Sequence, residues 1–294
     1  MTKTADRWVK CISTAGNVRG VGIQATELVR SMVETHDLDP VGSQGLGEAV
    51  MGALLLASYC KPGERINLNI QGSKNFRQAL VDAYPDGRVR GYVIQREFPT
   101  IADPENPNAG PWGTGLLSVL RTKDQVGQQP YIGTVPLVTG HLAKDLAFYW
   151  TQSEQVPSAV GLAVEMKDGK VQTAGGFLIQ ALPGATDREI RSIESHIREI
   201  HDVAREFATN PDPLSLISKL MQDEAFMVVE EQKLQFKCQC SRDRVERALA
   251  LVGVAELQSM IEEDKKATIR CDFCTKVYDF SLEQLESMVA QAKQ

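Results

Sequence analysis

Apolar and polar residues follow two different spacings along the first two thirds of the chain, which predicts a mixture of strands and helices. Ile66, Leu68 and Ile70 alternate with polar residues, as in a strand with one packed face and one wet face. Between Leu46 and Ser58, apolar residues occupy every face of the expected helix. We therefore expect this helix to be buried on all sides and to form the centre of the core.

The same spacings predict the other elements of an N-terminal mixed α/β domain. Further helices are expected at 26–34 and 141–152. A terminal hairpin has the Asp168-Gly169 pair at its turn, and a loop rich in proline, glycine and asparagine is expected at 99–115. The domain is expected to cover residues 1–183 and to have antiparallel-rich sheets. The expected strands are 7–13, 18–24, 66–70, 88–95, 115–121, 131–138, 159–166 and 171–182.

After Gly184 the chain changes to a helical pattern with a narrow apolar stripe. Charged residues fill the other faces, so the pattern predicts an amphipathic helix from Asp187 to Phe207 that must lean on another surface. Prolines at 211 and 213 end this helix, and a short second helix is expected at 214–220. Residues 184–234 are therefore expected to form a helical linker. Its apolar stripe consists of Ile190, Ile193, Ile197, Ile200 and Val203.

Residues 235–294 have the pattern of a separate small domain. Helices are expected at 241–251 and 254–263. Ser281 with Gln284 three residues later fits a capping box, which predicts a final helix beginning at Ser281. The whole chain is thus expected to be an α+β protein with an N-terminal domain, a helical linker and a C-terminal cysteine-containing domain.

Four of the six cysteines stand in this last segment as two tight pairs, Cys238-Gln239-Cys240 and Cys271-Asp272-Phe273-Cys274. Four thiolates match the tetrahedral ligand set of structural zinc, and no histidine lies between the pairs to compete as a ligand. Paired cysteines in a reducing compartment usually bind metal or carry out redox chemistry. The pattern predicts one zinc ion held by Cys238, Cys240, Cys271 and Cys274, while Cys11 and Cys60 are expected to be small core residues.

Zinc binding and disulfide formation exclude one another at such a site. Sulfurs around tetrahedral zinc are about 3.8 Å apart, whereas bonded sulfurs are about 2.05 Å apart. A structural zinc contributes about 10 to 16 kcal/mol to a small fold, so its loss is expected to unfold the segment and expose the linker stripe. Flanking cations either favour reactive thiolates or only offset the charge of a zinc tetrathiolate centre. They are Lys237, Arg242, Arg244, Arg270 and Lys276.

Charge and motifs exclude several functions. The 32 lysines and arginines against 38 acidic residues give a net charge of −6, which is unfavourable for a nucleic-acid binder. The longest apolar stretch, 49–57, is too short to cross a membrane, and the first 20 residues lack the features of a secretion signal, which indicates a cytoplasmic protein. Gly42, Gly45 and Gly47 form no nucleotide-binding motif, and no catalytic constellation is present, so we expect a protein that is not an enzyme.

The segments 235–242 and 270–274 resemble the zinc signature of the redox-regulated 33-kDa heat-shock chaperone family, with all four ligand positions present. The segments 46–61, 149–157 and 175–180 are also similar to family segments and occur in the expected order. The resemblance implies an ATP-independent holdase of the bacterial cytoplasm that is inactive when reduced and zinc-bound. It also implies that oxidation joins Cys238 to Cys240 and Cys271 to Cys274, releases zinc and unfolds the linker. The oxidised form would dimerise and bind unfolding client proteins.

Two other functions remain open for the cysteine segment. A constitutive zinc-ribbon adaptor would use the metal only as a structural support and would need a protein partner. A thiol oxidoreductase would use Cys271 and Cys274 alone, and it would need a thioredoxin-like βαβ context that the pattern around Cys271 does not predict.

Overall fold

The computed structural model describes residues 5–96, 109–123 and 129–292, and most of the loop predicted at 99–115 falls outside them. The chain divides into two compact units, 1–237 and 238–294. In the described part of the chain, no helix has both the length and the apolar character needed to cross a bilayer.

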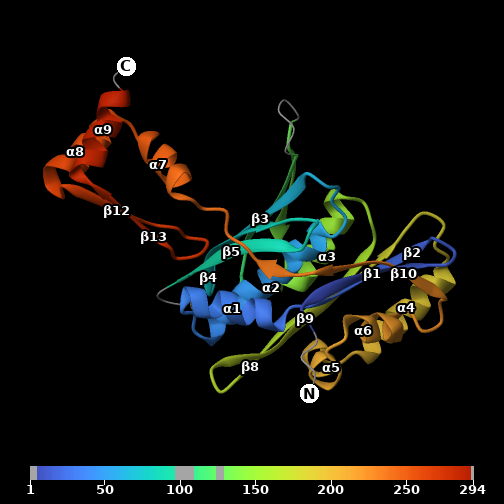
Figure 1. Cartoon of the computed structure of the whole chain (residues 1–294). Helices are drawn as coiled ribbons and strands as arrows, with labels where there is room; N and C mark the ends of the chain where they lie inside the picture. The colour runs from blue at the N-terminus through green and yellow to red at the C-terminus, as the bar shows by residue number, and fades with distance from the viewer. Residues whose placement is uncertain (1–4, 97–108, 124–128, 293–294) are drawn as a thin grey trace. The chain divides into compact units, whose positions relative to one another are not determined.

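The first unit contains two sheets (Figure 1). Sheet A has the strand order β10-β1-β2-β9-β8, and all its neighbours are antiparallel. Its strands are β1 (Arg7–Ser13), β2 (Val18–Gln24), β8 (Ser158–Lys167), β9 (Lys170–Ala181) and β10 (Phe226–Lys233).

Sheet B has the order β11-β5-β4-β3-β6-β7, and its neighbours are antiparallel except for the short parallel pair of β11 with β5. Its strands are β3 (Glu64–Gly72), β4 (Phe76–Ala83), β5 (Arg88–Gln95), β6 (Gly115–Lys123), β7 (Tyr131–Leu137) and β11 (Gln235–Phe236). The predicted α+β class with antiparallel-rich sheets is confirmed.

Helix α2 (Pro40–Ala57) lies between the two sheets and contacts strands of both. From Leu46 onward its apolar residues are buried on every face, which confirms the prediction of a central core helix. The helix begins earlier than predicted because Pro40 occupies its first turn and the Asp39 carboxylate accepts a hydrogen bond from the Gly42 amide at 2.7 Å. The other helices of this layer are α1 (Thr26–His36) and α3 (Leu142–Ser153).

Three further helices cover the opposite face of sheet A: α4 (Asp187–Glu199), α5 (Val203–Thr209) and α6 (Pro213–Leu220). Successive residues of a strand point to opposite faces, and Trp8 of β1 accordingly packs in the central core while Val9 packs beneath these helices. Ile193 of the predicted apolar stripe is buried in the same cluster as Val9.

The region 184–234 differs from its prediction in two ways. The single helix expected at 187–207 is two helices, because the Asp202 carboxylate caps α5 by accepting hydrogen bonds from the amides of Ala204 and Arg205. The end of the region is a strand, β10, in place of helix or loop. In this structure residues 184–237 pack within the first unit, so the division into residues 1–183, 184–234 and 235–294 stays a prediction about functional parts.

The second unit has its own small core, which includes Leu257, Phe280 and Leu285. The helices expected at 241–251, at 254–263 and after Ser281 are all present, and Gln284 accepts a hydrogen bond from the Ser281 amide at 3.0 Å. The hairpin of β12 and β13 was not predicted. The elements are α7 (Arg242–Ala250), α8 (Val254–Glu263), β12 (Lys266–Arg270), β13 (Val277–Ser281) and α9 (Leu282–Ala292).

Candidate metal centre

Two short segments of the second unit carry the four clustered cysteines. Cys238 and Cys240 precede α7, and Cys271 and Cys274 lie in the turn that joins β12 to β13. Backbone hydrogen bonds close this turn: the Cys271 amide donates to the Lys276 carbonyl at 2.9 Å, and the Thr275 amide donates to the Cys271 carbonyl at 2.8 Å. The hairpin therefore fixes the spacing of its two cysteines.

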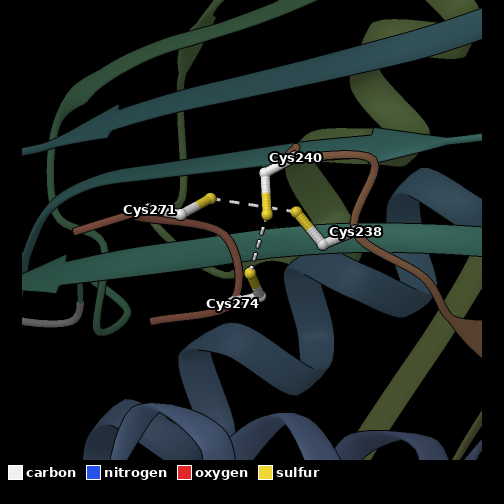
Figure 2. Close-up of side chains that lie close together, drawn as sticks. All are labelled: Cys238, Cys240, Cys271 and Cys274. Atoms are coloured by element: carbon white, nitrogen blue, oxygen red, sulfur yellow. Dashed lines mark hydrogen bonds between the residues drawn. The ribbon is translucent and has the colours of Figure 1, made fainter. Parts of the chain in front are cut away.

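The four sulfurs form one cluster, in which each lies within 4.8 Å of the others. Figure 2 shows the side chains directed toward a common centre. The sulfur of Cys238 lies 3.8 Å from that of Cys271, and the sulfur of Cys240 lies 3.3 Å from that of Cys274. Sulfurs around a tetrahedral zinc ion are about 3.8 Å apart, so the four side chains fit a four-sulfur metal site. None of these four cysteines is in a disulfide in this structure.

Tyr278 on β13 is a member of the centre that the sequence analysis missed. Its hydroxyl donates a hydrogen bond to the sulfur of Cys240 at 3.1 Å. Burial alone would raise the pKa of Cys240, but hydrogen bonds from Tyr278 and from the neighbouring thiols outweigh burial and lower this pKa to about 7. The same hydrogen bond raises the pKa of Tyr278 to about 12, and burial raises the pKa of Cys271 and of Cys274. In the sequence, the alternation of Tyr278 with Phe280 indicates a strand with both rings on one face, but it does not indicate the contact with sulfur.

Three of the flanking cations contact the scaffold of the second unit. The Arg242 guanidinium lies over the ring of Phe280, 4.6 Å from its centroid, and donates to the Asp279 carbonyl. Arg244 donates to the Gln239 carbonyl at 3.0 Å, and Lys276 lies 5.2 Å from the centroid of the Tyr278 ring. These contacts order the segment around the cysteines in addition to adding positive charge.

The structure does not bring Cys11 and Cys60 into this group, because both belong to the first unit. Cys11 is buried beneath α4 to α6, and Cys60 is partly buried and packs against the central core. Burial raises the pKa of each thiol to about 11. Their expected role as small packing residues is consistent with these positions.

The thiol oxidoreductase alternative predicts a βαβ unit around Cys271. Cys271 instead follows β12 and leads into the antiparallel partner strand β13. This context differs from the one in which a Cys-x-x-Cys motif stands at the start of a helix and gains reactivity from it.

Comparison with known proteins agrees with this geometry. A family model described as Hsp33 protein matches residues 6–281. The chain is 37% identical to the 33 kDa chaperonin of Geobacter sulfurreducens, over 96% of this chain and 94% of that protein. It is 34% identical to the 33 kDa chaperonin of Halalkalibacterium halodurans, over 98% and 99% of the two chains. A crystal structure described as the 33 kDa chaperonin (heat shock protein 33 homolog) of Thermotoga maritima superposes with a TM-score of 0.88 at 28% identity and covers 98% of this chain and 99% of that one.

Proposed function

Because the chain belongs to the Hsp33 family, we propose that it is a redox-regulated, ATP-independent holdase chaperone of the bacterial cytoplasm and not an enzyme. The relatives named as chaperonins support the chaperone part of this proposal. The observation that carries the redox part is the meeting of four cysteine sulfurs, from two segments far apart in the sequence, within 4.8 Å of one another.

In the reduced form, Cys238, Cys240, Cys271 and Cys274 would hold one zinc ion as thiolates. The ion would supply a cross-link between the segment before α7 and the β12–β13 hairpin. The second unit has a small core, and a structural zinc contributes about 10 to 16 kcal/mol to folds of this size. Its fold is therefore expected to depend on the metal.

Oxidation would remove the ligands. Each disulfide forms when two thiols lose two protons and two electrons, which one molecule of hydrogen peroxide accepts as it becomes two molecules of water. The family resemblance gives the pairs as Cys238 with Cys240 and Cys271 with Cys274. The contacts of 3.8 and 3.3 Å join cysteines of different pairs, so forming these disulfides requires the local backbone to rearrange. No thiolate would then remain for zinc, which would be released.

The helices of the linker support the next step, because they cover an apolar surface. Ile193, Phe207 and Ile217 are buried against the outer face of sheet A. Unfolding of residues 184–234 would uncover this face together with the apolar sides of the helices, and exposed apolar surface binds unfolded chains. The clients would be aggregation-prone proteins, and the oxidised form is proposed to be a homodimer. We propose no nucleic-acid or membrane partner.

The test follows metal, thiols and activity in one sample. The reduced, zinc-loaded protein is treated with hydrogen peroxide or hypochlorite while zinc release, free thiols and light scattering of heat-unfolding citrate synthase are recorded. We expect one zinc released and four thiols lost per chain, with scattering suppressed only after oxidation. Equal suppression by reduced and oxidised protein would contradict the switch and favour the constitutive adaptor.

Two sets of cysteine variants separate the centre from the other thiols. Replacing Cys271 and Cys274 by Ser is expected to abolish zinc binding and the response to oxidant. Replacing Cys11 and Cys60 by Ala is the matched control, and it should leave zinc stoichiometry unchanged. Turnover of a small dithiol that needs Cys271 and Cys274 but not Cys238 or Cys240 would point to the oxidoreductase instead.

A further inference from the structure

Strand β10 is an edge strand of sheet A. It pairs with its neighbour along its whole length, but most of its apolar side chains are exposed. It pairs antiparallel with β1 from Arg7 opposite Lys233 to Ser13 opposite Phe226. The side chains of Met227, Val228 and Val229 are exposed by 55%, 42% and 60%. A strand that buries so little apolar surface contributes mainly its hydrogen-bonding edge to the sheet.

Strand β1, in contrast, is fixed independently of β10. Trp8, Val9 and Cys11 are buried on the two faces of sheet A, and β1 also pairs with β2 along its inner edge. Departure of β10 would leave β1 in place, with the N–H and C=O groups of its outer edge without partners. Such an edge is a template for another strand.

The segment after β10 continues to the edge of sheet B. Strand β11 pairs with the start of β5, and the Lys237 amide donates to the Val89 carbonyl at 2.9 Å. Cys238 is the next residue of the chain. The residues that close the outer edges of β1 and β5 are therefore joined in sequence to the first cysteine of the metal centre.

Two cations of β1 lie beside its outer edge and pair with acidic residues of the region 184–234. Lys10 Nζ lies 2.6 Å from a carboxylate oxygen of Glu230, and Arg7 Nε lies 3.5 Å from one of Glu231. Arg7 also pairs with Asp212 at 3.1 Å. These three anions all belong to residues 184–234. Release of that region would remove them together and leave two cations beside an open strand edge.

We propose that the outer edge of β1 is a docking site for an extended segment of an unfolded client, which adds to sheet A as a strand in place of β10. The inference rests on the proposed function, because it requires that oxidation releases residues 184–234. Strand addition gives affinity through the backbone and therefore accepts many sequences. The two cations add a preference for an apolar run followed by acidic residues, which is the pattern of β10 itself, Phe226 to Glu231. In the reduced protein β10 acts as a built-in competitor.

A fluorescent peptide with the sequence of residues 226–233 tests the site on the full chain. We expect it to bind the oxidised protein at least tenfold more tightly than the reduced protein, measured by fluorescence anisotropy. Two further peptides carry N-methyl groups on alternate backbone nitrogens, one set facing β1 and the other facing solvent. The set that faces β1 should weaken binding at least tenfold and the other should not. Equal effects of both sets would overturn strand addition.

The charge preference has its own test in the same assay. A peptide in which both glutamates are replaced by lysine should bind the oxidised protein less tightly, and Lys10→Glu in the chain should reverse this order. Lys170→Glu, at the far end of β9 in the same sheet, is the matched control and should leave the order unchanged. An order that Lys10→Glu does not alter would overturn the role of the two cations.

Hydrogen–deuterium exchange locates the client without any substitution. The amides of β1 that face β10 should exchange faster after oxidation and become protected again when unfolding citrate synthase is bound, while those that face β2 stay protected. A complex that suppresses aggregation while the outer-edge amides of β1 stay unprotected would overturn the docking site and leave the holdase function standing. An oxidised protein that neither suppresses aggregation nor binds the peptide would overturn both.

Discussion

The ring of Phe207 on α5 lies directly against the backbone of Gly175 on β9. A Cβ atom at Gly175 would stand 2.4 Å from the ring, well inside van der Waals contact. Gly22 on β2 is in a similar position, because a Cβ there would stand 2.6 Å from the Pro213 carbonyl oxygen. Helices α5 and α6 of the proposed linker therefore rest on glycines of sheet A, and only glycine permits so close an approach.

A methyl group at Gly175 should lift α5 from the sheet. We expect Gly175→Ala to weaken linker docking by about 1 to 3 kcal/mol, the range for overpacking a core contact. The reduced variant should then suppress aggregation of citrate synthase without oxidant, as measured by light scattering. Gln172→Ala, an exposed position on the same strand, is the matched control. Reduced Gly175→Ala that is as inactive as the parent would show that α5 does not hold the chaperone off.

The apolar stripe of α4 gives a second way to release the linker. Ile193 is buried and Ile197 is partly buried against the outer face of sheet A. Replacing a buried isoleucine by a small residue typically lowers the free energy of packing by about 2 to 5 kcal/mol, so Ile193→Ser should cost up to this amount and Ile197→Ser should cost less. Activity of the reduced protein should rise, and limited proteolysis should cut the region 187–220 more rapidly. The double variant Arg191→Ser and Arg198→Ser changes exposed positions on the same helix and should match the parent in both assays.

The hydroxyl of Tyr278 supports the centre through the sulfur of Cys240. Groups that hydrogen-bond a metal ligand typically change metal affinity by about 10- to 100-fold when they are removed. Tyr278→Phe is therefore expected to weaken zinc binding by at least tenfold, measured by competition with a chromogenic chelator, and to leave the helix content unchanged. The hydroxyl of Tyr131 donates to the Ser153 carbonyl in the first unit, so Tyr131→Phe is the matched control and should bind zinc like the parent. Unchanged affinity in Tyr278→Phe would mean that the hydroxyl serves only the fold.

A partly buried acid on the central helix predicts how stability changes with pH. Burial raises the pKa of Glu48 to about 7, and its hydrogen bond from Gln44 opposes this only in part. The folded protein keeps this proton up to about pH 7 while the unfolded chain loses it near pH 4.5, so the free energy of unfolding falls between these values and levels off above pH 7.

Glu48→Gln should remove that dependence. We expect the variant to be about 1 to 3 kcal/mol more stable than the parent at pH 8 and more stable by less than about 1 kcal/mol at pH 5. Urea unfolding followed by tryptophan fluorescence measures this, because Trp8, Trp112 and Trp150 all lie in the first unit. Glu34→Gln, an exposed position on α1, is the control and should behave like the parent at both pH values. A parent protein with equal stability at pH 5 and pH 8 would contradict the assignment.

Burial patterns explain which strands could be predicted from the sequence. Ile66, Leu68 and Ile70 of β3 alternate cleanly because one face of the strand packs on α2. The missed strand β10 has no such alternation, since Met227, Val228 and Val229 are contiguous and exposed and the place of the strand depends on pairing with β1. Strand β4 was missed for a related reason, because Leu80, Val81 and Ala83 make its second half apolar on both faces.

The cysteines of the candidate site could be predicted from the sequence, whereas the other contacts of the site could not. The cysteines could be grouped because the chemistry of a four-sulfur site fixes the number and type of ligands, and the family resemblance supported the same residues. Tyr278 could not be assigned to the site from the sequence, because a tyrosine that contacts a sulfur has the same local pattern as one that only fills a core. The break at Asp202 was visible in principle, since an aspartate before Ala204 and Arg205 is a typical start of a helix.

The pairing of β1 with β10 also has a consequence for synthesis of the chain. The first strand leaves the ribosome early, but its outer neighbour ends at Lys233 and is translated only after most of the protein has emerged. The outer edge of β1 therefore stays unpaired throughout most of translation. Its pairing with β10 joins residues that are far apart in the sequence, and such contacts form slowly. A nascent chain of this protein is expected to close the outer edge of sheet A only after Lys233 has been made.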